Sequence, residues 1–172
     1  MIKREHYLAK LRQLKDQNLI KVATGMRRTG KSTLLQMFRQ ELADSNVDIA
    51  ATQYINFEDP SYYRPDDWRG IYDEIVQNLV SGDKNYIFLD EIQNIKEFER
   101  LIDGLFVHPD IDLYVTGSNA YLLSSELATL LSGRYIEIHV LPLSFAEYYG
   151  YFSHDHRLDR SEKFEQFMHF GG

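Results

Sequence analysis

The sequence predicts a three-layer α/β fold, in which helices cover both faces of a mostly parallel, five-stranded sheet. Three observations lead to this prediction. Five short apolar runs of strand character alternate along the chain with segments of helical periodicity. A glycine-containing loop, residues 25–32, joins the first run to a helix, and two acidic residues close the third run. In a doubly wound parallel sheet, ligands bind at the carboxyl ends of the strands, where these polar groups gather.

The composition sets the broad class of the protein. Its 172 residues are enough for one domain, and 44% hydrophobic residues with twelve Tyr and ten Phe predict a packed core. The absence of Cys excludes disulfides and cysteine metal sites. No apolar run is long enough to span a membrane and the first residues do not resemble a signal peptide, so we expect a cytoplasmic protein. The net charge of −7 argues against nucleic-acid binding by the chain as a whole, but leaves a local basic face open.

Residues 2–15 have the pattern of an N-terminal helix. Apolar side chains share one side of it: Ile2, Leu8, Leu11 and Leu14. Basic side chains occupy the other side: Lys3, Arg4, Lys10, Arg12 and Lys15. A run of charges usually forms a solvated face beside the core, which is the prediction here, with a nucleic-acid contact as the alternative.

The first predicted strand, residues 19–23, leads into a loop that matches G-x-x-x-x-G-K-[ST], the phosphate-binding loop. Gly25 and Gly30 allow the backbone to curl, so that its N–H groups and the N-terminus of the next helix face an anion. Lys31 is expected to contact the β- and γ-phosphates, and the Ser32 hydroxyl to hold Mg²⁺. The predicted ATP-binding residues of this segment are Gly25, Met26, Arg27, Arg28, Thr29, Gly30, Lys31, Ser32 and Thr33.

Two consecutive arginines inside this loop are unusual, because these positions need only small or flexible residues. Arg27 and Arg28 are expected to contact the nucleotide or a partner laid over it. A solvated pair is the alternative.

The middle of the chain supplies an acidic pair at the end of a buried strand. A second strand over residues 53–57 is followed by a loop and a helix. Residues 86–89 are continuously apolar, as a strand buried on both faces is, and they end in Asp90 and Glu91. Together with the phosphate loop this is the Walker B pattern, in which Asp90 orders Mg²⁺ and Glu91 polarises the attacking water. A plain surface pair is the alternative, and Gln93 is a further candidate for placing water.

The last part of the chain completes the alternation. Helices are predicted over about 98–106, 121–131, 144–149 and 162–170, with strands over 111–115 and 135–140. The last strand alternates apolar and polar residues, as a half-exposed or edge strand does. We expect a P-loop domain over residues 1–150, and the start of a truncated C-terminal helical region over 151–172.

Polar residues after the fourth strand and before the fifth are the remaining site candidates. Thr116 and Ser118 are predicted to bind nucleotide and to orient the lytic water, with capping of the next helix as a compatible role. Arg134 is predicted to neutralise the transferring phosphate, in cis or from a neighbouring molecule. An ordinary salt bridge is its alternative. The expected catalytic residues are therefore Lys31, Glu91 and Arg134.

Several motifs in this order resemble one known family. They are residues 25–32 followed by Leu34 and Leu35, and residues 54–59, 88–93, 116–119, 132–134 and 142–148. Together they look like the prokaryotic P-loop ATPases of the AAA-like, type 14 group, over about residues 20–172. The resemblance implies ATP binding, the additive-strand Asp-Glu class of ATPase core and a C-terminal extension with a second domain. It supplies no biological task.

The function predicted from these features is Mg²⁺-dependent ATP hydrolysis that drives a conformational switch or remodels an unknown client. The alternative is a nucleotide-dependent binding module for nucleic acid or protein, with slow hydrolysis. Adenine is favoured over guanine because no strand is followed by Asn-Lys-x-Asp. A small-molecule kinase is disfavoured, because a water-activating Glu beside the Mg²⁺ acid favours hydrolysis. A homo-oligomer or a second domain that supplies or receives an arginine is the expected partner.

Overall fold

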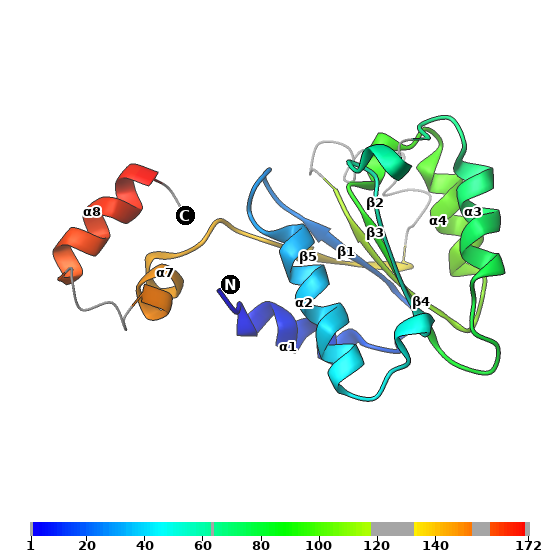
Figure 1. Ribbon diagram of the computed structural model, residues 1–172, viewed down its shortest axis with the longest axis horizontal. Helices are drawn as coiled ribbons and strands as arrows, with labels where there is room; N and C mark the ends of the chain where they lie inside the picture. Colours follow the sequence, from blue (N-terminus) through cyan, green and yellow to red (C-terminus); the bar gives the residue numbers. More distant parts are fainter. Residues whose placement is uncertain (1, 63, 118–132, 153–158, 171–172) are drawn as a thin grey trace.

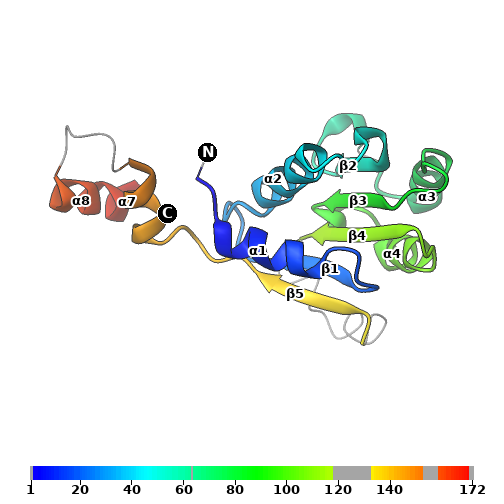
Figure 2. The ribbon, with the colours of Figure 1, turned by 90° about the horizontal axis from the view of Figure 1, so that it is seen from below.

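The computed structural model describes residues 2–62, 64–117, 133–152 and 159–170. Within these ranges, one five-stranded sheet forms in the order β2-β3-β4-β1-β5 (Figure 2), and every neighbouring pair is parallel. The strands are β1 (Ile20–Thr24), β2 (Thr52–Asn56), β3 (Asn85–Asp90), β4 (Ile111–Thr116) and β5 (Tyr135–His139). The predicted α/β class and its five strands are confirmed. β4 lies between β1 and β3, which is the added strand of the Asp-Glu class, and β5 is an edge strand as predicted.

Helices alternate with the strands. They are α1 (Glu5–Leu14), α2 (Lys31–Asp44), α3 (Trp68–Gln77), α4 (Phe98–Phe106), α7 (Phe145–Phe152) and α8 (Arg160–Phe170), with short 3-10 turns at Ile49–Ala51, Pro60–Tyr62 and Ile92–Asn94. α3 begins after Asp67, whose carboxylate accepts the Gly70 N–H at 2.9 Å as an N-cap. The helix predicted over residues 121–131 lies outside the described residues.

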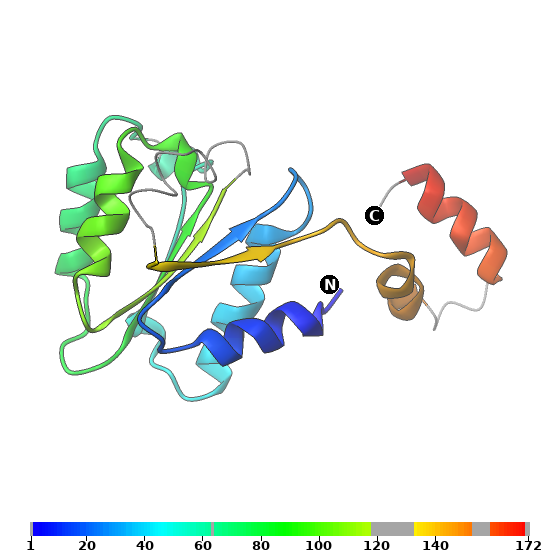
Figure 3. The same cartoon turned by 180° about the vertical axis from the view of Figure 1, so that it is seen from behind.

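The sheet lies between two helical layers, each with its own apolar core (Figures 1 and 3). α1 and α2 pack on one face, and α3 and α4 pack on the other. Successive strand residues point to opposite faces, so that Ile20 and Val22 join the α3–α4 core while Ala23 joins the α1–α2 core. Because both faces are covered, β1, β3 and β4 are buried along their whole length.

α7 and α8 stand apart from the sheet, beyond the carboxyl end of β5 (Figure 1). α7 runs across residue 150, where the sequence predicts a domain boundary. That boundary stays a prediction. None of the described helices is long and apolar enough to cross a membrane.

One residue of the N-terminal helix region contradicts the expected solvated face. Arg4 is only 7% exposed, whereas Lys3, Lys10 and Arg12 are exposed as predicted. Its guanidinium bonds to groups more than 130 residues away, on the segment after β5 and on α7. Helical periodicity cannot reveal such partners, because it describes only the contacts of one element.

Candidate nucleotide-binding site

The loop between β1 and α2 has the curled backbone that an anion nest requires. Gly25 has φ 145°, Arg28 has φ 67° and Gly30 has φ 87°. A Cβ on Gly25 would lie 2.2 Å from the carbonyl oxygen of Val140, so only glycine fits where the loop packs on the end of β5. Gly30 directly precedes α2, which directs the helix N-terminus toward the loop.

Lys31 lies inside this loop and is 3% exposed. Its Nζ donates to the carbonyl oxygens of Gly25 at 3.2 Å and Met26 at 3.1 Å. The same Nζ lies 3.6 Å from the Oε1 of Glu91. Within the described part of the chain its partners are two carbonyls and one carboxylate, and a buried ammonium in this position can also donate to phosphate oxygens.

Asp90, at the end of β3, is completely buried and accepts hydrogen bonds from three hydroxyl groups. Ser32 donates to Oδ1 at 3.0 Å, and Thr116 donates to the same oxygen. Tyr54 donates to Oδ2 at 2.6 Å. Burial raises the pKa of the Tyr54 phenol, and the bond to Asp90 raises it further, so the phenol acts as a donor.

Glu91 follows with a left-handed backbone, φ 54°. Its N–H donates to the Thr116 hydroxyl at 2.9 Å, and its carboxylate accepts from Gln93 Nε2 at 2.6 Å. Gln93 Oε1 is buried and has no hydrogen-bond partner in the part of the chain that the structure describes. Thr116 therefore joins both acids to β4, and Gln93 orients the second of them.

These groups fit a nucleotide phosphate with Mg²⁺. The Ser32 hydroxyl and the Asp90 carboxylate are adjacent hard oxygen ligands, which Mg²⁺ prefers. Among the described residues, no three His, Cys, Asp or Glu side chains form a metal-binding group. Mg²⁺ usually takes only one or two protein carboxylates and completes its shell with water and phosphate oxygens.

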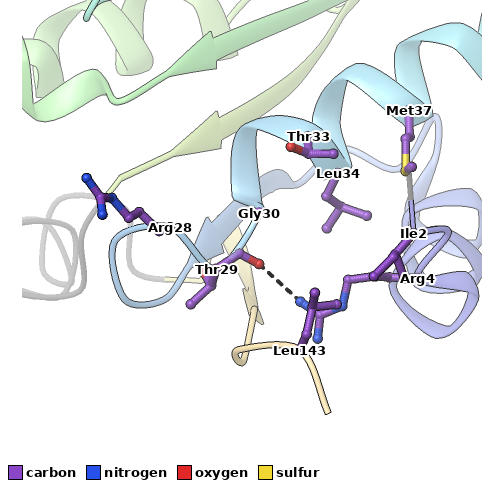
Figure 4. Close-up of a pocket in the computed structure, with 9 residues that line it drawn as sticks. All are labelled: Ile2, Arg4, Arg28, Thr29, Gly30, Thr33, Leu34, Met37 and Leu143. Carbon is purple, nitrogen blue, oxygen red and sulfur yellow. Dashed lines mark hydrogen bonds between the residues drawn. The ribbon is translucent and has the colours of Figure 1, made fainter. Parts of the chain in front are cut away.

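A cavity of about 210 Å³ opens beside the loop, on the side of α1 (Figure 4). Its lining residues are Ile2, Arg4, Arg28, Thr29, Gly30, Thr33, Leu34, Met37 and Leu143. The predicted nucleotide residue Thr33 faces this cavity rather than the acids. Most of the lining is apolar, and it continues directly from the loop.

The structure places the remaining predicted site residues in different surroundings. Arg27 is exposed and pairs with Glu58 at 2.9 Å. Arg28 is exposed, and its guanidinium points away from Arg4 (Figure 4). Ser118 lies outside the described residues. Its role and those of both arginines stay predictions.

Arg134 lies at the opposite end of the sheet from the phosphate loop. Its carbonyl accepts the N–H of Ile20, the first residue of β1, at 2.8 Å. Its guanidinium pairs with Asp103 of α4 at 3.0 Å, as the salt-bridge alternative described, and lies 6.0 Å from the Phe106 ring. A five-residue strand spans roughly 16 Å, so contact with the phosphates of its own chain does not fit this geometry. Action on a neighbouring molecule stays a prediction.

Sequence reasoning missed Tyr54 and Arg4 as parts of the site. Tyr54 lies on β2, directly beside Phe88 of β3, and its side chain reaches the end of β3. The sequence contains a tyrosine in the second predicted strand. Its contact with Asp90 could be predicted only once β2 was known to lie beside β3.

Comparisons with known proteins agree with this geometry. The AAA domain family, type 14, matches residues 17–149. An uncharacterized protein of Haemophilus influenzae is 44% identical over 149 residues, 86% of this chain and 37% of the relative. Another, from Methanocaldococcus jannaschii, is 32% identical over 169 residues, 90% of this chain and 35% of the relative. The chain thus spans little more than a third of each relative.

Solved structures show the same fold at low identity. RIF2 of Saccharomyces cerevisiae has a TM-score of 0.57 at 13% identity, over 95% of this chain and 69% of that one. PCH-2 of C. elegans has a TM-score of 0.55 at 17% identity, over 84% and 44%. Drosophila ORC, solved with AT-rich DNA and Cdc6, has a TM-score of 0.54 at 14% identity, over 81% and 56%. At these identities the likeness concerns the fold alone.

Proposed function

The chain belongs to the type 14 family of AAA domains, a nucleotide-binding ATPase family, and from this premise we propose that it binds ATP with Mg²⁺ and hydrolyses it. One observation carries the proposal. Lys31 and Ser32 of the phosphate loop lie against Asp90 and Glu91, so a phosphate-binding group and a carboxylate base meet at one end of the sheet.

Each residue has a role that follows from its contacts. Lys31 exchanges loop carbonyls for phosphate oxygens and supplies positive charge there. Ser32 and Asp90 would hold Mg²⁺, which would supply positive charge against the phosphate groups. When Lys31 bonds to phosphate oxygens, it no longer pairs with Glu91. The Glu91 carboxylate keeps its bond to Gln93 and can then accept a proton from water.

The cavity beside the loop supports an adenine nucleotide. Its apolar lining by Leu34, Met37 and Leu143 suits the faces of a purine ring, and Thr33 offers a hydroxyl at its wall. The phosphates would lie at the loop while the base occupies the cavity. The use of the released energy, as a switch or in remodelling a client, belongs to the longer protein and is part of the proposal.

Two variants test the proposal by separating binding from turnover. Lys31→Ala removes a buried charge from the phosphates and should weaken MgATP binding by roughly 2–5 kcal/mol in calorimetry. Glu91→Gln keeps the shape of the side chain but cannot take the proton, so binding should persist while phosphate release falls by about 10²–10⁴.

The exposed residues Lys96 and Glu165 provide matched controls. Lys96→Ala and Glu165→Gln should behave as the unaltered chain in both assays. MgATP affinity that is unchanged in Lys31→Ala would refute the phosphate site. Normal single-turnover hydrolysis in Glu91→Gln would move the base elsewhere.

A further inference from the structure

Arg4 brings three distant parts of the chain together on one side chain that is 8% exposed. Its Nη1 donates to the carbonyl oxygen of Thr29 in the phosphate loop at 3.1 Å (Figure 4). The same nitrogen donates to the carbonyl oxygen of Leu141, after β5, at 2.7 Å. Its Nε donates to Glu147 Oε1 of α7 at 2.8 Å. The guanidinium carbon lies 4.6 Å from the centre of the Tyr7 ring, which is a cation–π contact.

Glu147 is also the residue that organises the start of α7. Its carboxylate accepts the N–H of Ser144 at 2.7 Å, and its own N–H donates to the Ser144 hydroxyl at 3.2 Å, which is a capping box. Burial acts to raise the pKa of Glu147, but the bonds from Arg4 and Ser144 outweigh it and lower the pKa, so the carboxylate is ionised. α7 buries no side chain of its own. Its placement against the P-loop domain therefore depends strongly on the bonds to Arg4.

The Thr29 carbonyl that Arg4 contacts belongs to a peptide group whose N–H is expected to bind phosphate. The Thr29 carbonyl and the Gly30 N–H belong to one rigid peptide plane and point in opposite directions. Gly30 has left-handed backbone angles and directly precedes α2, where an anion is attracted to free N–H groups. A phosphate that draws the Gly30 N–H toward itself would tilt this plane and displace the carbonyl that Arg4 holds.

We infer that Arg4 is a positioning residue that transmits phosphate binding in the loop to the C-terminal helices through Glu147. The inference rests on the proposed function and adds an output to it. Arginine suits this role because its planar fork bonds to carbonyl and carboxylate groups at the same time, whereas a lysine ammonium cannot span them in fixed geometry.

Amide hydrogen exchange of residues 145–152, with and without Mg·ADP or Mg·ATPγS, tests the inference. In the unaltered chain, bound nucleotide should change the exchange rates of these amides at least threefold. Glu147→Gln retains a side chain that can form the capping box, but it loses the charge that Arg4 pairs with. It should bind nucleotide within threefold of the unaltered chain and lose the response of α7. Arg4→Lys should lose the response as well.

The control is Glu41→Gln, which weakens an exposed pair between α2 and Arg12 of α1 at 2.9 Å. It should respond as the unaltered chain does. Nucleotide binding with no change in the exchange of α7 would overturn the relay and leave the proposed function intact. A response that survives in both Glu147→Gln and Arg4→Lys would also overturn the relay. An unaltered chain that fails to bind nucleotide in calorimetry would refute the proposed function, and the relay with it.

Discussion

The carboxylate of Asp90 shows how single residues set the chemistry of this site. It is fully buried, and hydroxyl groups from α2, β4 and β2 donate to it. A buried carboxylate needs donors that replace the hydrogen bonds it loses to water. The hydroxyls of Ser32 and Thr116 fix the direction of Oδ1, and the hydroxyl of Tyr54 fixes the direction of Oδ2. Groups that orient a metal ligand in this way usually influence metal affinity as well.

Tyr54→Phe removes the only bond that the described structure gives to Oδ2 of Asp90. The carboxylate then becomes less well oriented, and we expect Mg²⁺ to bind to the nucleotide complex about 10-fold more weakly. Affinity for ATP in the presence of a chelator should be unchanged, because the hydrogen bonds of the Tyr54 hydroxyl join it to Asp90 and Gln36 rather than to the phosphate loop. Titration of Mg²⁺ against a fluorescent ATP analogue measures both quantities.

Tyr72→Phe is the matched control, since it also removes a half-buried phenol bond, at 2.9 Å to His108, but on the opposite face of the sheet. It should leave the Mg²⁺ titration unchanged. Equal Mg²⁺ affinity in Tyr54→Phe and the unaltered chain would show that Asp90 does not need the phenol.

At the scale of single residues, the sequence predicts those site residues that a short motif contains. Lys31, Ser32, Asp90 and Glu91 are recognisable because a loop motif or a strand end contains them. Arg4 was expected in solvent because its partners lie more than 130 residues away. Only the folded sheet brings those partners to it.

At the scale of the elements, the face of the sheet under α1 contains a buried polar network. The Nζ of Lys21 is bonded to Asp112, and both side chains are fully buried. Tyr114 donates to Asp112 at 2.8 Å, and Tyr86 donates to Asp16 at 2.9 Å. Burial raises the pKa of both phenols, and the neighbouring carboxylates raise it further. Burial lowers the pKa of Lys21 despite Asp112.

This network predicts a loss of stability in alkali. An unfolded tyrosine ionises near pH 10, while the native Tyr114 keeps its proton, so the native state holds more protons above that pH. Each such tyrosine lowers the free energy of unfolding by about 1.4 kcal/mol per pH unit. Lys21 acts in the opposite direction only up to its unfolded pKa of 10.5, because a native lysine with a lowered pKa holds fewer protons there.

Urea unfolding between pH 10.5 and 11.5 therefore lies above the unfolded pKa of Lys21, and a comparison with a phenylalanine variant isolates Tyr114. Tyr114→Phe should reduce the decline of the unfolding free energy by about 1.4 kcal/mol per pH unit relative to the unaltered chain. Parallel declines for the two proteins would mean that Tyr114 ionises in the native state.

The elements themselves were predictable because each has its own periodicity. All five strands lie where their apolar runs predict them, within one or two residues. The order of the strands in the sheet was predicted only from the family resemblance, because the residue pattern of one strand does not show which strands lie beside it.

At the scale of the whole molecule, the two ends of the sheet have different chemistry. The carboxyl ends of β1 and β3 hold the phosphate loop and the acids, and the amino end of β5 holds Arg134. Its guanidinium is half exposed and pairs with Asp103, so it is accessible to another molecule. A second copy that presents this end to the phosphate loop would complete the site with an arginine.

Arg134→Ala should then leave MgATP affinity nearly unchanged and lower turnover, because an arginine finger acts on the transition state and is worth about 10³–10⁵ in rate. Turnover per molecule should rise with protein concentration for the unaltered chain and remain low for the variant. Steady-state phosphate release over a concentration series measures this. The control is Arg100→Ala, which removes an exposed arginine that lies on α4 and should behave as the unaltered chain.

Asp103→Asn separates action on a neighbour from a structural role. If the pair with Asp103 only stabilises the fold, this variant and Arg134→Ala should lose similar stability and both should turn over normally. If Arg134 must leave Asp103 to reach a neighbour, Asp103→Asn should retain or increase turnover, since the arginine is then easier to release. Turnover that is independent of concentration, together with normal turnover in Arg134→Ala, would make Arg134 structural and leave Arg27 and Arg28 as the next candidates.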